Sequence, residues 1–219
     1  MYYVFPKVVS KKECEKLLDY CIINTEFKEA AVLNKGESDA DIERVSPGIL
    51  NAYKQATKTD LVDRFGRLDP SIRKTDVAFV EADGNEGNTV NEVAWHYLNE
   101  ANDLKFNYKF RIYQTVQFAR YRDGGHYGWH RDVNESAISP NGESRKLSLT
   151  LCLTDPKDYE GGELQFFNGE RPMDKKTVEE IRGQGSVIVF DSRDWHRVTP
   201  VTKGTRYSLV CWSVGPNFV

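Results

Sequence analysis

At about residue 75 the residue pattern changes, and this change limits the folds open to the chain. Beyond it, short runs rich in β-branched and aromatic residues alternate with clusters of glycine, proline, asparagine and aspartate, as in strands joined by tight turns. The turn signals lie at residues 123–125, 140–142, 161–162 and 183–185. Strands are predicted at residues 75–80, 113–121, 147–153, 163–167, 186–190 and 206–214.

Two helices are predicted outside these strands. Ser10 and Glu13 have the spacing of a capping box and precede an apolar helical pattern, which predicts a helix over residues 11–23. A second apolar stripe predicts a helix over residues 90–104. The polar segment 34–70 is weakly periodic, and no element is assigned to it. Helices followed by many strands predict a mainly β fold with flanking helices, a double-stranded β-helix or jelly roll.

The length of 219 residues suits a single domain with a sizeable core. We expect residues 1–105 to form a supporting region of helices and strands, and residues 106–219 to form the jelly-roll core. The hydrophobic fraction of 39% and the charged fraction of 29% indicate a globular protein. The net charge of −3 lacks the basic excess of a nucleic-acid-binding domain, so no nucleic acid partner is expected.

The sequence also limits the cellular setting. It contains no apolar run of about 20 residues, and its start lacks the regions of a signal peptide, so we expect a cytoplasmic protein with no membrane partner. The cysteines form no CxxC pair and fall in predicted helices and strands, which favours reduced, buried side chains over disulfides or metal ligands. They are Cys14, Cys21, Cys152 and Cys211.

A possible metal site begins at His130. Asp132 follows two positions later, so the alternation of a strand places both side chains on one face. His196 follows the strand predicted at residues 186–190, and a neighbouring strand of the roll would bring it alongside. Two histidines and one carboxylate leave the other metal positions open, as a non-haem Fe(II) oxygenase requires. The triplet alone is a weak signal, and a surface pair or a hydrogen-bonded core pair is its common alternative.

Arg206 lies at the start of the last predicted strand, ten positions after His196. Its planar guanidinium can bind a carboxylate through two parallel hydrogen bonds. We therefore expect it to bind the distal carboxylate of a dicarboxylate cosubstrate such as 2-oxoglutarate. An exposed charge at a strand end is the alternative.

Four motifs follow one another between residues 118 and 212. They are YRDGGHYGWHRD at 121–132, SLTLCLTDP at 148–156, YEGGEL at 159–164 and HRVTPVTKGTR at 196–206. Together they resemble the Fe(II)/2-oxoglutarate-dependent dioxygenases of the prolyl 4-hydroxylase superfamily, and within it the PKHD-type hydroxylases. The first hundred residues carry no recognised signature.

The resemblance implies an iron site formed by His130, Asp132 and His196. It implies that Arg206 and Tyr121 hold 2-oxoglutarate. Fe(II), 2-oxoglutarate and dioxygen are the implied cofactor and cosubstrates, with ascorbate as a reductant. No side chain is expected to act as a nucleophile, so no catalytic residue is assigned beyond the metal ligands.

The resemblance also implies prolyl 4-hydroxylation of a peptide or protein substrate. Tyr127, Arg145 and Trp212 match substrate-binding positions of prolyl 4-hydroxylases, and each has core or rim packing as its alternative. Other functions remain open: hydroxylation of a free amino acid or small metabolite, a metal-binding or ligand-binding jelly roll without turnover, and a purely structural domain.

Some residues depart from the family pattern or stay unassigned. Position 206 is arginine where animal collagen-type enzymes use lysine, and Cys152 stands where oxygen-sensing relatives have a tyrosine. His126, placed in a turn, and His96, placed in a helix, are not assigned as ligands. The polar loop 133–144 is expected to close over the substrate.

Overall fold

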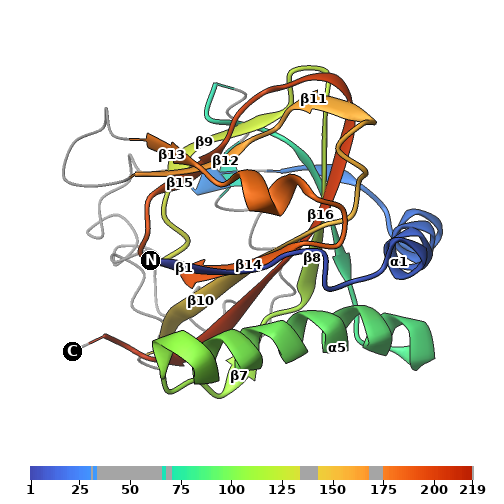
Figure 1. Cartoon of the computed structure of the whole chain (residues 1–219). Helices are drawn as coiled ribbons and strands as arrows, with labels where there is room; N and C mark the ends of the chain where they lie inside the picture. The colour runs from blue at the N-terminus through green and yellow to red at the C-terminus, as the bar shows by residue number, and fades with distance from the viewer. Residues whose placement is uncertain (31, 34–65, 68–70, 134–142, 168–174, 219) are drawn as a thin grey trace, which may run out of the picture.

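The computed structural model describes residues 1–30, 32–33, 66–67, 71–133, 143–167 and 175–218. Over these residues most strands belong to two antiparallel sheets, and two α-helices cover one face of the larger sheet (Figure 1). This arrangement agrees with the mainly β fold with flanking helices that the sequence predicts. Strands from both sides of residue 105 share the larger sheet, and the predicted division of the chain at this point stays a prediction.

The larger sheet has nine strands among the described residues. Its order runs β1-β14-β10-β16-β8-β6-β2, and β11 and β7 also pair with β16. The bounds are β1 Tyr2–Phe5, β14 Val187–Asp191, β10 Glu143–Cys152, β16 Val201–Pro216, β8 Val116–Arg122, β6 Asp76–Val80, β2 Lys28–Glu29, β11 Tyr159–Gly161 and β7 Ile112–Tyr113.

The smaller sheet lies on the side of the larger sheet away from helix α5 (Figure 1). Its order is β13-β12-β15-β9-β5. The bounds are β13 Lys175–Thr177, β12 Leu164–Phe167, β15 His196–Val198, β9 His126–His130 and β5 Arg73–Lys74. A separate pair joins β3 (Val32–Leu33) to β4 (Gly66–Arg67).

The helices begin and end where local chemistry permits. Helix α1 spans Lys11–Asn24, and the predicted capping box is confirmed because the Ser10 hydroxyl accepts from Glu13 N while the Glu13 carboxylate accepts from Ser10 N. Helix α5 spans Gly84–Ala101 and continues as a π-helical turn, Asn102–Phe106. A short 3₁₀ helix covers Glu179–Arg182.

Alternation along the strands of the larger sheet builds two cores, because both faces of this sheet are covered. Toward the helices, Leu149, Val189 and Leu209 pack with Leu17 of α1 and Leu98 of α5. On the opposite face of the larger sheet, side chains of β8 and β14 pack with the inner side chains of β12 and β15. This second cluster includes Ala119, Tyr121, Leu164, Phe166, Ile188, Phe190 and Val198.

Several predicted bounds were wrong. Helix α5 begins six residues before position 90, because its first turns are polar and glycine-containing and lack the apolar stripe used for the prediction. Strand β16 begins at Val201, so Arg206 lies inside the strand and not at its start. His126 lies in β9 and not in a turn. The two-residue strand β5 was not predicted, because it is too short to show a period.

The cysteine prediction is confirmed, since all four thiols are free and buried. In the described part of the chain, no helix is long and apolar enough to cross a membrane. Most of the segment 34–70 and of the loop 133–144 lies outside the described residues, as does the turn predicted at 140–142.

Candidate metal centre

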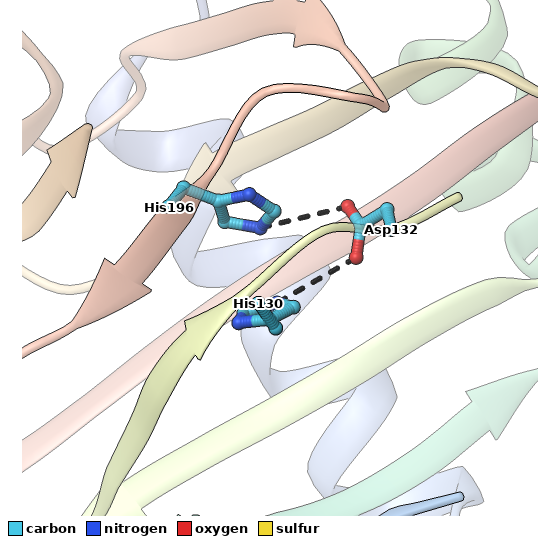
Figure 2. A group of neighbouring side chains, drawn as sticks. All are labelled: His130, Asp132 and His196. Carbon is cyan, nitrogen blue, oxygen red and sulfur yellow. Dashed lines mark ion pairs between the residues drawn. The ribbon is translucent and has the colours of Figure 1, made fainter. Parts of the chain in front are cut away.

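Three possible metal donors converge where β9 meets β15. In the antiparallel pairing of these strands His130 lies directly opposite His196, and Asp132 follows β9 by two residues. Figure 2 shows both imidazole rings directed at the Asp132 carboxylate. His130 Nε2 lies 3.6 Å from Asp132 Oδ1, and His196 Nε2 lies 3.6 Å from Asp132 Oδ2. All three donor atoms lie within 4.8 Å of one another, as the sequence pattern predicts.

Backbone carbonyls orient both imidazole rings. His130 Nδ1 lies 2.8 Å from the Gly128 oxygen, and His196 Nδ1 lies 2.9 Å from the Asp194 oxygen. Because a carbonyl oxygen can only accept, each Nδ1 carries a proton, and each Nε2 is the ring nitrogen that faces Asp132. The separations of 3.6 Å from the carboxylate are too long for hydrogen bonds. This arrangement fits an ion held between the three side chains.

The protonation states suit a cation. Burial and the neighbouring His196 lower the pKa of His130 to about 3, so this imidazole is neutral. Burial alone would raise the pKa of Asp132, but His196, His130 and Arg145 outweigh it, and the pKa falls below its usual range. The neutral His130 imidazole and the ionised Asp132 carboxylate are the forms that bind metals.

Hydrogen bonds join the segment that follows β9 to the segment that precedes β15. Asp132 N and Val133 N both donate to the Ser192 carbonyl, at 2.9 and 3.0 Å. The Ser192 hydroxyl lies 2.9 Å from that of Ser148 on β10. A hydrogen bond from Ser148 also contributes to lowering the pKa of Asp132. Sequence reasoning missed both serines, because neither stands at a recognised spacing from the triplet.

Arg206, which the sequence predicts to bind 2-oxoglutarate, lies on β16 of the larger sheet. It lies opposite Tyr121 in the pairing of β16 with β8 and is only 2% exposed. Its Nη1 donates to the Ser208 hydroxyl at 3.3 Å, and the guanidinium carbon lies 5.4 Å from the centre of the Tyr121 ring. Among the described residues, no carboxylate forms an ion pair with it. A buried cation of this kind is stabilised by a bound anion.

Comparison with known proteins places this site in a family. Residues 116–214, which contain all three donors and Arg206, match the 2OG-Fe(II) oxygenase superfamily. These residues form a 2OG-Fe(II) oxygenase domain. Fe(II), 2-oxoglutarate and dioxygen, predicted from the sequence, are the cofactor and cosubstrates of this superfamily.

Curated relatives match part of the chain. A PKHD-type hydroxylase of Pseudomonas putida is 36% identical over 96 residues, 42% of this chain and 40% of the relative. A PKHD-type hydroxylase of Gloeothece citriformis is 40% identical over 102 residues, 47% of this chain and 43% of the relative. The predicted relation to PKHD-type hydroxylases is confirmed. The match spans about two fifths of the length of these relatives.

Solved structures resemble nearly the whole chain. The viral collagen prolyl hydroxylase of Paramecium Bursaria Chlorella virus-1 has a TM-score of 0.59 at 20% identity, covering 98% of this chain and 96% of its own. A Pseudomonas putida prolyl-4-hydroxylase has a TM-score of 0.51 at 18% identity, covering 91% of this chain and 97% of its own. These likenesses confirm the predicted jelly-roll fold.

The three residues predicted to bind substrate lie near the metal donors of the oxygenase domain. The Tyr127 ring stacks on His130 with ring centres 3.5 Å apart. Arg145 donates from Nε to the Gln114 side chain at 2.9 Å and from Nη1 to the Asp132 carbonyl at 3.4 Å. Its guanidinium carbon lies 3.8 Å from the centre of the buried Trp212 ring. Tyr127 and Arg145 therefore border the donors directly, and Trp212 contacts Arg145.

The YEGGEL motif shapes the surroundings of Arg206 in the oxygenase domain. Gly162 has φ +62°, and a methyl group there would lie 2.9 Å from Arg206 Cδ and 2.9 Å from Val201 Cγ2. The buried Tyr159 hydroxyl lies 3.9 Å from the Cys152 thiol. The motif was recognised in the sequence, but the part that its glycine plays beside Arg206 was not.

Sequence reasoning missed Arg73 of β5, which lies outside the residues of the superfamily match. Its side chain is 9% exposed, and its guanidinium carbon lies 4.3 Å from the centre of the Tyr127 ring. Pairing of Arg73 with Tyr127 across β5 and β9 brings it there. The two histidines left unassigned lie outside the donor group: His126 Nδ1 contacts the Gly124 carbonyl, and His96 pairs with Glu100 on α5.

Proposed function

We propose that this chain is an Fe(II)- and 2-oxoglutarate-dependent hydroxylase that acts on a prolyl residue of a peptide or protein. The observation that carries the proposal is the pairing of two sites on facing sheets. A metal-donor group lies on the smaller sheet, and a buried arginine without a described carboxylate partner lies on the larger one. This combination suits a dicarboxylate that binds a metal at one end and a guanidinium at the other.

His130, Asp132 and His196 would hold Fe(II) from one side and leave its other positions open. Bound iron, with 2-oxoglutarate and dioxygen, supplies the oxidising chemistry. The side chains supply fixed donors, because both imidazoles are held by carbonyls and the Asp132 backbone is held by Ser192.

Arg206 would bind the distal carboxylate of 2-oxoglutarate, with Tyr121 beside it on β8. The aromatic and aliphatic side chains between the sheets exclude water from this place, which strengthens the charged contact. Such charged hydrogen bonds contribute about 1.5 to 3 kcal/mol each.

The choice of a prolyl substrate is supported by the relatives and by the surroundings of the donors. The solved structures that share the fold include prolyl hydroxylases. Tyr127 and Arg145 border the metal donors and offer a ring face and a guanidinium to a substrate. The guanidinium can donate to a peptide carbonyl next to the reacting proline.

The test is oxygen exposure of the Fe(II)-loaded chain with 2-oxoglutarate and a panel of proline-containing peptides. Succinate release and the mass gain of one oxygen atom on the peptide are measured together. His130→Ala should abolish both signals, because it removes a metal donor. Arg206→Ala should raise the KM for 2-oxoglutarate roughly tenfold or more, since a charged contact is lost, and Arg206→Lys should lie between.

The outcomes separate the competing functions. Oxidation of a prolyl peptide that depends on both residues supports the proposal. Succinate release with free amino acids but not with peptides would move the substrate to small metabolites. Tight iron and 2-oxoglutarate binding without succinate under any condition would identify a binding protein instead.

A further inference from the structure

A buried arginine, Arg73, and a partly buried one, Arg145, lie close to Tyr127 and the metal donors. Arg73 reaches the ring of Tyr127 from β5, and Arg145 reaches the Asp132 carbonyl from β10. The two positive charges are close enough to influence each other and the Tyr127 hydroxyl. Arg145 and Arg73 are therefore two neighbouring cations beside the donors.

Neither arginine forms an ion pair with a carboxylate in the described part of the chain, although the Asp132 carboxylate is near enough to Arg145 to raise its pKa. The Nε atom of Arg73 is buried and donates to no described acceptor, and the guanidinium contacts the face of the Tyr127 ring. Arg145 donates to neutral oxygens, those of the Gln114 side chain and the Asp132 backbone. Burial lowers the pKa of Arg145, which shows that removal of water acts against its charge.

The charges of the proposed metal and cosubstrate cancel without these two arginines. Fe(II) and Arg206 carry three positive charges, and Asp132 with the two carboxylates of 2-oxoglutarate carries three negative charges. Arg73, which is buried, and Arg145, which is partly buried, then leave two positive charges beside the donors that no charge in this sum offsets. Among the described residues no carboxylate forms an ion pair with either arginine, and a substrate can bring one.

We propose that Arg73 and Arg145 bind a carboxylate that the substrate carries close to the hydroxylated proline. This inference rests on the proposed function and defines its substrate class. The carboxylate could belong to an acidic residue beside the proline or to the proline itself at a chain end. Both sources present the same planar group, which a guanidinium binds through two hydrogen bonds.

The test measures peptide binding without oxygen, with Fe(II) and 2-oxoglutarate bound, by titration calorimetry. One pair of peptides is identical except for glutamate or glutamine next to a central proline. A second pair ends in proline, with either a free carboxylate or an amide. One acidic member should bind roughly tenfold or more tightly than its neutral partner, as expected for a charged contact. The pair that shows this difference identifies the source of the carboxylate.

Variants connect the preference to Arg73. Arg73→Gln should reduce the preference to less than about threefold, whereas Arg73→Lys should retain part of it because the charge remains. Lys74→Gln is the matched control, since Lys74 is the neighbouring residue of β5 and its side chain is exposed. It should leave the preference unchanged.

Equal binding of the acidic and neutral members in both pairs would overturn the inference. Retention of the full preference in Arg73→Gln would also overturn it. The proposed function has a separate readout, because peptide oxidation after oxygen is admitted is scored whichever member binds better. Oxidation of neutral and acidic peptides with equal efficiency would keep the hydroxylase and remove the carboxylate requirement.

Discussion

At the scale of single residues, the candidate site depends on backbone groups that fix the positions of its side chains. The carbonyls of Gly128 and Asp194 keep the Nε2 atoms of His130 and His196 directed at Asp132. Gly162 leaves room for Arg206, because it has no side chain to occupy the space next to the aliphatic part of the arginine. Backbone carbonyls and a glycine therefore help to position the side chains of the candidate site.

Gly162→Ala should weaken 2-oxoglutarate binding and destabilise the protein by about 1 to 3 kcal/mol. The new methyl group would sit in a left-handed backbone conformation, 2.9 Å from the Arg206 stem. Titration with 2-oxoglutarate and urea unfolding check the two effects.

Gly84→Ala provides the control for this substitution. Gly84 also has a positive φ, +64°, but nothing lies within 4 Å of the position of its added methyl group. It should lose stability and keep its affinity for 2-oxoglutarate. Equal affinity in all three proteins would show that Gly162 does not shape the Arg206 site.

At the scale of elements, the pairing of β9 with β15 brings His130 opposite His196, and the pairing of β16 with β8 brings Arg206 opposite Tyr121. A shift of one residue in either pair would turn these side chains to the other face of the sheet. The helices have a different part, because α1 and α5 cover the far face of the larger sheet and supply no donor.

Ser10→Ala should destabilise the protein by about 1 kcal/mol through the loss of the α1 cap. The Ser10 hydroxyl and the Glu13 carboxylate satisfy each other's backbone amides at the start of this helix. Chemical denaturation measures the loss, and Ser10→Thr should restore most of it. Metal affinity should not change, and a large change in it would contradict the separation of α1 from the site.

At the scale of the whole molecule, the larger sheet separates a structural core from a functional one. Its helix-facing side chains pack with α1 and α5, and its opposite side chains pack with the smaller sheet around the site. Phe190 belongs to the second group, and its ring centre lies 4.6 Å from that of His196. Leu149 belongs to the first group.

Leu149→Ala and Phe190→Ala should each destabilise the protein by about 2 to 5 kcal/mol, because both side chains are buried. Only Phe190→Ala should also weaken metal binding, since it removes the ring that supports His196. Urea unfolding and metal titration at a temperature where both variants are folded measure the two quantities. Equal loss of metal affinity in Leu149→Ala would show that the two cores are not independent.

Local residue patterns determined the types of most elements and several site residues. Alternation predicted that His130 and Asp132 lie together, which the structure confirms although β9 ends at His130, and the capping box marked the start of α1. These features involve residues close together in the chain, so local geometry is sufficient to predict them. The four motifs identified the family for the same reason, since each lies within a short segment.

Tertiary structure alone decided the remaining features. Arg73 meets Tyr127 because β5 pairs with β9, more than fifty positions later, and a two-residue strand has no period from which this pairing could be predicted. The Ser192 carbonyl accepts from Asp132 N, although the two residues are 60 positions apart in the sequence. Gly162 is important because the side chain of Arg206, on β16, lies next to it. Contacts between distant segments depend on strand order and register, which the packing of the whole chain selects.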